Sequence, residues 1–385
     1  MAKTQGAKVD SLRIIHCFRS PVGGIFRHVR DLIHEQVKQG HEVGIICDNN
    51  TGGAFEEQLL EEITPRLALG LHRFSMQRKI GLGDIKITWN LYKNIKRLDV
   101  DVLHAHGAKG GAYARIIGTF LGTRTKRPAR LYCPHGGSMH YDGNKLSGRI
   151  YFKLERLLEN VTDRLIFVSA YERDGYFSKV GKARCPHTLA RNGLTKKEFK
   201  PLKTKKNATD FLFIGMMRDL KGVDLFLNAL PLVAQKTNRK ITATLVGDGP
   251  DLEEYNALAS TLGDKVTVKF LKPTPARKVF GMGKFLVVPS RAESMPYIVL
   301  EAIAAQRPTI ATRVGGIPEI YAEYSQALVE PDNLEALATA MAGNLVGTLH
   351  LPAPKIFAER IQENFSVAVM AQDIMTAYQA CIAAK

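Results

Sequence analysis

Apolar residues along the chain gather in short runs of strand length, and amphipathic segments with apolar positions at helical spacing lie between them. The expected strands include residues 12–18, 41–47, the end of 98–106, 130–134, 164–168, 210–214, 241–246, 266–271, 284–289 and 308–312. The expected helices include residues 26–39, 144–161, 223–235, 297–305, 334–345, 355–364 and 366–384. Strands that alternate with helices are typical of α/β proteins with doubly wound parallel sheets.

The strand and helix pattern begins twice, which predicts two domains. A chain of 385 residues is long enough for two separate cores. Residues 200–207 contain one proline, several charges and no apolar period, so we expect a linker there. We therefore expect a first domain over residues 1–199 and a second over 200–365. Residues 64–97 are basic, and we expect them to be irregular.

The charge is uneven between the two halves. The chain has 54 Lys and Arg against 37 Asp and Glu, a net charge of +17. Residues 1–200 carry 34 of the basic and 19 of the acidic residues, so most of the excess lies in the first domain. Such a domain is expected to face an anionic partner, either a phospholipid surface or a phosphorylated acceptor. Aromatic residues do not alternate with the basic ones, and we expect no nucleic-acid partner.

Residues 144–161 combine an apolar helical period with a cationic stripe formed by Lys145, Arg149, Lys153 and Arg156. Such a helix can lie on an anionic membrane. It can equally be a domain helix with its apolar face in the core. Both interpretations stay open at this point.

The compartment is expected to be the cytoplasm, with peripheral attachment to the inner face of a membrane as a second possibility. The N-terminal residues lack the apolar core of a signal peptide, and no apolar run is long enough to span a membrane. The five cysteines are scattered and are expected to be reduced thiols.

A loop with two carboxylates follows the expected strand 284–289. Glu293 lies in the loop, and Glu301 lies eight residues later on the helix 297–305. Ligands of open parallel sheets bind at the carboxyl ends of the strands, where carboxylates can accept hydrogen bonds from sugar or ribose hydroxyls. The alternative is one loop glutamate and one solvated helix glutamate. The Gly315-Gly316 turn is expected to expose backbone at the same edge of the sheet.

Two cations precede the expected helix 223–235. Arg218 and Lys221 flank a turn that ends at Gly222. Cations at a helix N-terminus are suited to bind a diphosphate, although a solvated charged loop is the alternative.

The first domain has two further candidates, both next to glycines. Gly23 and Gly24 stand at the start of the first expected helix, where the backbone can approach a ligand closely or simply make a tight turn. His135 follows the strand 130–134 and precedes two glycines, as a cleft histidine or a turn histidine would.

The order of strand, loop, helix, strand and Gly-Gly turn over residues 284–319 resembles the Glu-x7-Glu motif of family-4 glycosyltransferases. Lys221-Gly222, the His135-Gly136 pair and the Arg191-Asn192-Gly193 turn are also similar to that family. The resemblance implies the GT-B fold, two Rossmann-like domains that face a cleft. It implies an N-terminal acceptor-binding domain, to which the C-terminal helix (about 366–385) returns, and a C-terminal nucleotide-sugar-binding domain.

The resemblance also assigns roles to individual residues. Glu293, His135 and Lys221 are the expected catalytic residues, and Glu301 is expected to bind the donor ribose. Arg218 does not follow Gly215 directly, as the family pattern would have it, because Met216 stands there. The full set of expected donor-binding residues is Gly23, Gly24, Arg218, Lys221, Glu293, Ser294, Met295, Pro296 and Glu301.

No metal and no cofactor are expected, because cations and backbone amides can stabilise the leaving diphosphate. Asp99-Val-Asp101 matches the metal motif of a different glycosyltransferase fold, but it precedes a strand and is expected to be a strand entry. His104 and His106 are expected to point to opposite faces of their strand, and therefore not to share a metal.

The expected function is retaining transfer of a hexose from a nucleotide-sugar to an acceptor. The expected acceptor is a lipid-linked or anionic glycan of cell-surface polysaccharide synthesis. Two alternatives remain. One is another GT-B enzyme, such as a nucleotide-sugar epimerase or a phosphorylase. The other is a non-catalytic protein that binds anionic surfaces.

Overall fold

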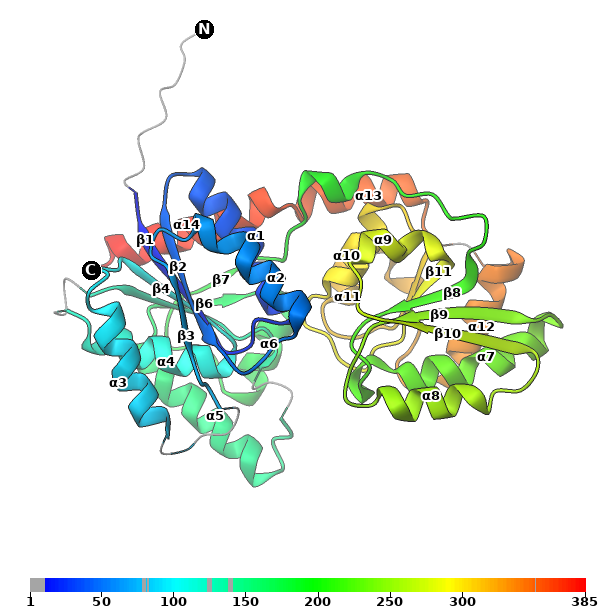
Figure 1. Ribbon diagram of the computed structural model, residues 1–385, viewed down its shortest axis with the longest axis horizontal. Helices are drawn as coiled ribbons and strands as arrows, with labels where there is room; N and C mark the ends of the chain where they lie inside the picture. The colour runs from blue at the N-terminus through cyan, green and yellow to red at the C-terminus, as the bar shows by residue number, and fades with distance from the viewer. Residues whose placement is uncertain (1–10, 78–80, 82, 123–126, 138–140, 350) are drawn as a thin grey trace, which may run out of the picture. The chain divides into compact units, whose positions relative to one another are not determined.

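The computed structural model describes residues 11–77, 81, 83–122, 127–137, 141–349 and 351–385, which form two α/β units (Figure 1). The first unit contains Met1–Val168, Glu172–Ala190 and Met370–Lys385, and the second contains Ser169–Tyr171 and Arg191–Val369. The boundary therefore falls before Arg191, earlier than the expected linker at 200–207. The residues preceding position 11, which carry the prediction about a leader sequence, lie outside the described residues.

The first unit is built on a seven-stranded sheet with the order β3-β2-β1-β4-β5-β6-β7, in which neighbouring strands are parallel. The strands are β1 (Arg13–Phe18), β2 (Glu42–Asp48), β3 (Leu71–Phe74), β4 (Val102–His106), β5 (Ala129–Cys133), β6 (Arg164–Phe167) and β7 (His187–Leu189). The helices are α1 (Gly23–Lys38), α2 (Ala54–Ile63), α3 (Gly83–Ile95), α4 (Gly107–Phe120), α5 (Leu146–Leu158) and α6 (Ala170–Lys179).

Two apolar cores cover the two faces of this sheet. Phe26 and Ile33 of α1 and Leu60 of α2 pack with Phe18 and Ile45 on one face. Residues from α3, α4, α5 and α6 pack with the alternate strand positions on the other face. Successive side chains of a strand point to opposite faces, so each strand contributes to both cores.

The second unit is built on a five-stranded parallel sheet with the order β10-β9-β8-β11-β12. The strands are β8 (Thr209–Ile214), β9 (Ile241–Val246), β10 (Val266–Leu271), β11 (Gly283–Val288) and β12 (Thr309–Ala311). The helices are α7 (Val223–Thr237), α8 (Leu252–Ser260), α9 (Ala276–Val279), α10 (Tyr297–Ala304), α11 (Ile317–Tyr321), α12 (Leu334–Val346) and α13 (Pro354–Asn364).

Each sheet has one point where the order of its strands reverses, between β1 and β4 in the first and between β8 and β11 in the second. Ligands of doubly wound sheets bind beyond the carboxyl ends of the strands at such a point. The loops after β8 and β11 carry Lys221 and Glu293, and the turn after β1 leads into Gly23. The topology therefore places these candidate residues at the switch points of the two sheets.

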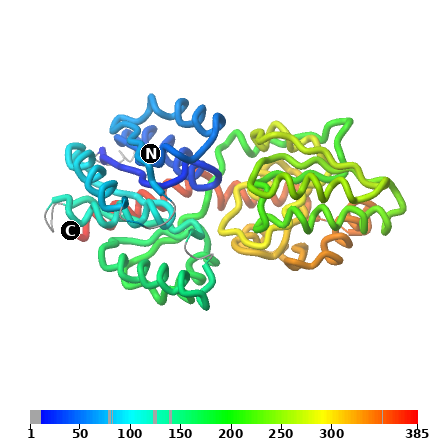
Figure 2. The backbone as a smooth tube through the Cα atoms, turned by 60° about the horizontal axis from the view of Figure 1, so that its bottom comes forward, coloured from blue at the N-terminus to red at the C-terminus, as the bar shows by residue number. Residues whose placement is uncertain are grey.

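The last helix, α14 (Val367–Ala383), begins in the second unit and ends in the first (Figures 1 and 2). Tyr378 is fully buried, and its hydroxyl lies 2.7 Å from Nδ1 of His104. The C-terminus therefore returns to the first unit, as expected from the family resemblance.

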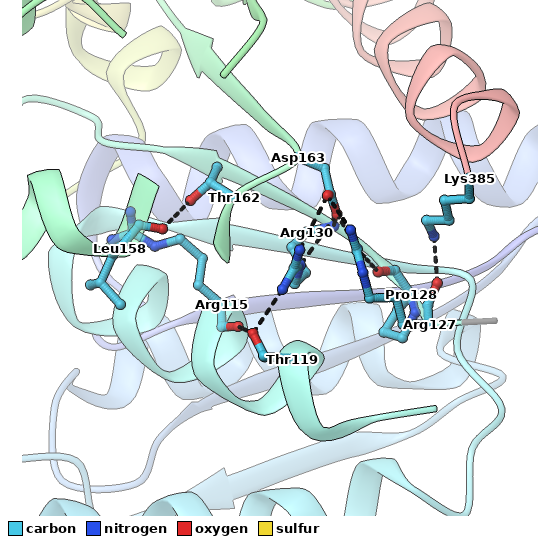
Figure 3. A network of polar contacts seen from close by, with 9 residues as sticks. All are labelled: Arg115, Thr119, Arg127, Pro128, Arg130, Leu158, Thr162, Asp163 and Lys385. Atoms are coloured by element: carbon cyan, nitrogen blue, oxygen red, sulfur yellow. Dashed lines mark hydrogen bonds and ion pairs between the residues drawn. The ribbon is translucent and has the colours of Figure 1, made fainter. Parts of the chain in front are cut away.

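A polar network connects the amino ends of β5 and β6 with the C-terminus of the chain (Figure 3). Asp163 accepts hydrogen bonds from Arg127 and Arg130, and the Lys385 amine donates to the Arg127 carbonyl. Burial works to raise the pKa of the Asp163 carboxyl, but the two arginines outweigh it and hold that pKa at about 2. This carboxylate therefore stays charged under ordinary conditions.

The expectation that residues 64–97 are irregular is wrong, because they contain β3 and α3. Leu91 and Ile95 of α3 face the core, while Ile85 and Trp89 are 70% and 55% exposed. With apolar residues on both sides of the helix, the sequence shows no clear helical period. Among the described residues, no helix is long and apolar enough to cross a membrane.

Candidate active site

Two of the expected catalytic residues of the second unit meet in the structure. Lys221 Nζ lies 2.5 Å from Oε1 of Glu293, although 71 residues separate them in the chain. The Ser290 hydroxyl donates to the same carboxylate oxygen over 2.8 Å. The side chain of Glu293 is 9% exposed and that of Lys221 is 28% exposed. The loops after β8 and β11 thus present a half-buried ion pair.

The glycine after Lys221 explains how these two loops come together. Gly222 has a φ of +64° and is the N-cap of α7. A Cβ atom at this position would lie 2.1 Å from the carbonyl oxygen of Pro289, at the end of β11. Only glycine fits this close approach, which holds the Lys221 turn against the end of β11.

Arg218 precedes the short 3-10 turn Asp219–Lys221 and is half-buried. Its side chain makes no hydrogen bond or ion pair with any described residue. On the turn that carries Lys221 there is thus a cation that no carboxylate of the described residues pairs with. Its contact with a diphosphate stays a prediction.

Arg291, which no sequence motif indicates, joins both loops. Its guanidinium makes two hydrogen bonds of 2.7 Å with the carboxylate of Asp224, and it also reaches Asp219 and Asp332. Its amide donates to the carbonyl of Leu220. Hydrogen bonding with Asp224 raises the pKa of Arg291. No local pattern indicates this residue, because its partners lie up to 72 positions away.

The Gly315-Gly316 turn packs on the catalytic loop and does not simply expose its backbone. Gly315 has a φ of +59°, and a Cβ there would lie 1.6 Å from the carbonyl oxygen of Glu293. The Gly316 amide donates to the Ser294 carbonyl over 2.8 Å. The expected role of this turn is therefore corrected, because the Gly316 amide is occupied by the loop that carries Glu293.

The remaining residues of the loop are held from several sides. Ser294 is half-buried, whereas Met295 and Pro296 are buried. The Asn192 side-chain amide donates to the Met295 carbonyl over 2.8 Å. Pro296 is the N-cap of α10, which carries the partly exposed Glu301. The ribose contact of Glu301 and the donor contacts of the loop stay predictions.

The first unit presents Gly23 and Gly24 at the N-terminus of the 16-residue helix α1, where both are exposed. Gly23 has a φ of +61°, and no atom lies within 4 Å of a Cβ built there. The glycine is therefore needed for its backbone conformation and not for a close contact. The positive end of the helix dipole is suited to an anion, which stays a prediction.

His135 follows β5 and has a φ of +51°. Its Nε2 lies 3.0 Å from Nδ1 of His106, whose own Nε2 lies 3.0 Å from Nδ1 of His16. Burial, with a smaller contribution from His28, holds the pKa of His135 well below its usual range. His135 is therefore a neutral imidazole at the carboxyl end of the sheet.

The expectation about His104 and His106 is wrong. Residues two apart on a strand point to the same face, and the two rings lie 4.2 Å apart between centroids. Ring nitrogens of His16, His104 and His106 lie within 4.8 Å of one another, as do those of His28, His106 and His135. Opposite faces were the reason for expecting that the two histidines do not share a metal, and that reason is wrong.

Two parallel α/β units with candidate residues at their switch points define the GT-B class of protein. Solved structures with this fold are similar over nearly the whole chain. The Anabaena protein HepE, in complex with UDP and glucose, has a TM-score of 0.77 at 16% identity and covers 96% of this chain and 99% of its own. Sucrose-phosphate synthase from Thermosynechococcus elongatus has a TM-score of 0.74 at 19% identity, over 97% and 100% of the two chains.

The family is defined by two models that match consecutive parts of the chain. Residues 22–195 match the Glycosyltransferase Family 4 model, and residues 208–345 match the model of Glycosyl transferases group 1. The chain therefore belongs to the group 1, family 4 glycosyltransferases, and it is a transferase.

Two of the following three curated relatives are named as glycosyltransferases. A glycosyltransferase of Methanocaldococcus jannaschii is 26% identical over 81% of this chain and 82% of its own. The phosphatidylinositol N-acetylglucosaminyltransferase gpi3 subunit of Schizosaccharomyces pombe is 23% identical over 89% of this chain and 75% of its own. A protein of the cps region of Klebsiella pneumoniae is 27% identical over 60% of this chain and 66% of its own.

Proposed function

We propose that this glycosyltransferase transfers a hexose from a nucleotide diphosphate-sugar to an anionic or lipid-linked glycan acceptor, with retention of configuration. The single observation that carries the proposal is the Lys221–Glu293 ion pair between the loops after β8 and β11. It places a cation for phosphate next to a carboxylate for sugar hydroxyls, at the switch point where a ligand is expected. The UDP and glucose bound to HepE support a nucleotide-sugar as donor.

Lys221 carries the charge that the reaction needs. When the glycosidic bond to the donor phosphate breaks, negative charge develops on the leaving diphosphate, and a fixed cation nearby stabilises it. Arg218, half-buried on the same turn, adds a second positive charge. Cations in this position can replace a metal ion, so we propose a reaction without a metal or other cofactor.

Glu293 and Glu301 accept hydrogen bonds from the hydroxyl groups of the donor. Glu293 accepts hydrogen bonds from Lys221 and Ser290 in the structure, and a sugar hydroxyl can donate to its remaining lone pairs. Glu301 is assigned the ribose. His135 is neutral and is assigned the donor sugar, whose hydroxyls need a hydrogen-bond partner and no charge.

The acceptor is proposed to be anionic, because cations gather on the first unit. An open hollow of about 470 Å³ beside α5 is lined by Arg149, Lys153 and Lys179, together with Gly143, Phe152 and Ser178. A phosphate group of the acceptor would meet three cations there. The name of the Schizosaccharomyces pombe relative describes transfer to a phosphatidylinositol, which supports a lipid-linked acceptor.

The solvent-exposed face of α5 supports a cytoplasmic protein that attaches to an anionic membrane surface. Leu146, Ile150 and Leu157 are 74%, 48% and 63% exposed, and they follow one side of the helix with Lys153 between them. Phe152 is buried on the opposite side. An apolar stripe bordered by cations is typical of helices that lie in a membrane interface.

Transfer assays with lipid acceptors test the proposal. The protein is incubated with UDP-, GDP- and ADP-hexoses and a lipid-phosphate acceptor, and the products are separated by mass and by anomeric configuration. We expect one donor to give an α-linked product from an α-linked donor. An inverted product would contradict the retaining mechanism. Conversion of the donor without any acceptor would indicate an epimerase.

Vesicle sedimentation tests the membrane surface separately. The wild type is expected to bind vesicles with anionic phospholipids at low salt, and Ile150→Ser with Leu157→Ser to weaken that binding by about tenfold. The matched control is Leu349→Ser, since Leu349 is 46% exposed on the second unit. Equal binding by all three proteins would remove α5 as the docking surface.

A further inference from the structure

A chain of hydrogen bonds runs through the first unit and ends at His135. Gln36 Oε1 lies 2.9 Å from Nε2 of His16, and Nδ1 of His16 lies 3.0 Å from Nε2 of His106. Nδ1 of His106 then lies 3.0 Å from Nε2 of His135. Gln36, His16 and His106 are at most 1% exposed, so the protein itself provides the partners along this path.

The sheet register brings the imidazoles into line. His16 on β1 is paired with His104 on β4, and His106 follows two positions later on the same face. Gln36 comes from α1, which covers that face, and Tyr378 comes from α14. Residues from α1, β1, β4, α14 and the turn after β5 build this hydrogen-bond network, which explains why no local motif indicates it.

The imidazoles are neutral. Burial is the main cause that lowers the pKa of His16 to about 4 and those of His106 and His135 well below their usual range. A neutral imidazole has one N–H donor and one acceptor nitrogen. Each ring of the chain must therefore donate on one side and accept on the other, and the direction of one hydrogen bond determines that of the next.

The direction follows from Gln36. Its Oε1 can only accept, so His16 carries its proton on Nε2 and accepts with Nδ1. His106 must then donate from Nε2 and accept with Nδ1. His135 in turn donates from Nε2, which leaves its Nδ1 without a proton.

A second contact lies on the other side of the Gln36 amide, where the Tyr378 hydroxyl can accept from the amide N–H or donate to the amide oxygen. In the structure, Nε2 of Gln36 donates to the Tyr378 hydroxyl over 3.3 Å, and that hydroxyl lies 2.7 Å from Nδ1 of His104. The branch ends at His104, whose Nε2 is buried without a hydrogen-bond partner among the described residues. If the amide were reversed, its N–H would face His16 and every ring along the chain would have to exchange its tautomer.

We propose that Gln36 and Tyr378 are positioning residues that set the tautomer of His135 through His16 and His106. The proton is held on Nε2 of His135, so that Nδ1 can accept a hydrogen bond from a hydroxyl group of the donor sugar. The role of Nδ1 rests on the proposed function of His135, whereas the setting of the tautomer does not. Gln36 and Tyr378 need not touch the substrate.

The tautomer is measured by NMR in protein labelled with ¹⁵N-histidine, because the shifts of the two ring nitrogens identify the protonated one. The His135 signals are assigned by their loss in His135→Asn. We expect the proton on Nε2 of His135 in the wild type and in Gln39→Met, a matched change at an exposed glutamine next to α1. Gln36→Met is expected to give a mixture of both tautomers.

Tyr378→Phe is the second variant, in case Gln36→Met fails to fold. It keeps Gln36 but removes the hydroxyl that contacts the amide, and a mixture of tautomers is again expected. The same His135 tautomer in the wild type and both variants would overturn the proposal. A wild type with the proton on Nδ1 would overturn the assigned direction.

Zinc is the rival explanation, since nitrogens of His16, His104 and His106 lie within 4.8 Å of one another. The purified wild type is analysed for zinc, and its histidine spectrum is recorded before and after a chelator. A spectrum that does not change supports the hydrogen-bonded chain. Zinc at one equivalent, with ring signals that shift on its removal, would overturn it.

A binding experiment separates the tautomer from its use. Affinity is measured for a nucleoside diphosphate with and without the hexose, in the wild type and in Tyr378→Phe. We expect about twofold weaker binding of the nucleotide-sugar alone, because in an even mixture of tautomers about half of the protein keeps the competent form. If the tautomer changes but this affinity does not, the setting of the tautomer stands and the assignment of His135 to the donor sugar fails.

Discussion

The candidate residues of the two units are held in place by different forces. In the second unit, ion pairs join the loops, namely Lys221 with Glu293 and Arg291 with Asp224. In the first unit, neutral hydrogen bonds connect His135 to His106 and onward into the sheet. The ion pairs remain in contact with solvent, whereas the imidazoles behind His135 are fully buried.

The difference follows from the cost of burying charge. When an ionisable group loses its contact with water, its pKa changes in the direction that favours the neutral form. Burial accordingly lowers the pKa of His106. Lys221 and Arg291 are 28% and 21% exposed, so they can remain charged and meet an anionic ligand. We infer that the ion-paired loops of the second unit are suited to the charged phosphates of the donor, and that the neutral His135 of the first unit is suited to a hydroxyl group.

The largest expected effect comes from removing the cation of the second unit. Lys221→Met should lower kcat by about 100-fold, because a fixed charge that stabilises the leaving group is lost. The control is Lys236→Met, which breaks the surface pair of Lys236 with Glu335. Initial rates of transfer measure both, and equal rates in the two variants would show that Lys221 does not act on the diphosphate.

The next effect concerns the glycine that brings the two loops together. Gly222→Ala should lower the free energy of unfolding by more than about 2 kcal/mol, since the left-handed backbone alone costs alanine about 1 kcal/mol and the new Cβ meets the Pro289 carbonyl. Gly347→Ala shares the left-handed backbone but has no atom within 4 Å of its Cβ. Urea unfolding should therefore give about 1 kcal/mol for that control, and an equal loss at Gly222 would refute the close-contact argument.

A smaller effect is expected at Arg291. Arg291→Met removes the hydrogen bonds to Asp224 and leaves the two loops less well aligned, so donor affinity should fall by about tenfold. Calorimetric titration with the nucleotide-sugar measures it. Arg313→Met, which breaks an exposed pair with Glu330, is the control and should bind as the wild type does. Unchanged affinity in Arg291→Met would mean that the loops keep their geometry without this link.

The smallest effect is expected at Asp163, a charged carboxylate in the first unit, where the hydrogen bonds behind His135 are neutral. Its pKa of about 2 is below the usual value for an unfolded chain, so its stabilisation is present above about pH 4 and is lost as the pH falls towards 2. The carboxylate is partly open to solvent, and screening reduces the effect to about 1 kcal/mol. Unfolding by urea at pH 6 and pH 3 should show a smaller acid loss in Asp163→Asn.

The control for this prediction is Asp174→Asn. Arg173 lowers the pKa of the Asp174 carboxyl, but this pair lies on an exposed surface where solvent screens it, so Asp174→Asn should change the acid loss less than Asp163→Asn does. An identical pH response of Asp163→Asn and the wild type would show that the arginine network of Figure 3 adds no acid-dependent stability.

Much of the second unit could be predicted from the sequence, because its signals are local. The strands β9 (Ile241–Val246) and β10 (Val266–Leu271) begin and end where expected, since short apolar runs bounded by turn residues define them. Lys221-Gly222 and the loop around Glu293 could be found for the same reason. Each motif lies within one strand–loop–helix segment.

The features that could not be predicted from the sequence depend mainly on contacts between distant segments. Arg291 is fixed by Asp219, Asp224 and Asp332, and no local pattern connects these positions. The hydrogen-bonded histidines and their partners come from α1, β1, β4, α14 and the turn after β5, which are far apart in the sequence. The helix α3 was missed for a different reason, because its exposed Trp89 and Ile85 obscure the apolar period. The opposite-face prediction for His104 and His106 misapplied the two-residue period of a strand.

The central claim is that the Lys221–Glu293 pair forms the binding site of a nucleotide-sugar, and calorimetric titration tests it most directly. UDP-, GDP- and ADP-glucose are titrated into the wild type, Lys221→Met and Lys236→Met. The account predicts that one nucleotide-sugar binds the wild type and Lys236→Met alike and binds Lys221→Met at least tenfold more weakly. Equal binding to all three proteins would contradict it.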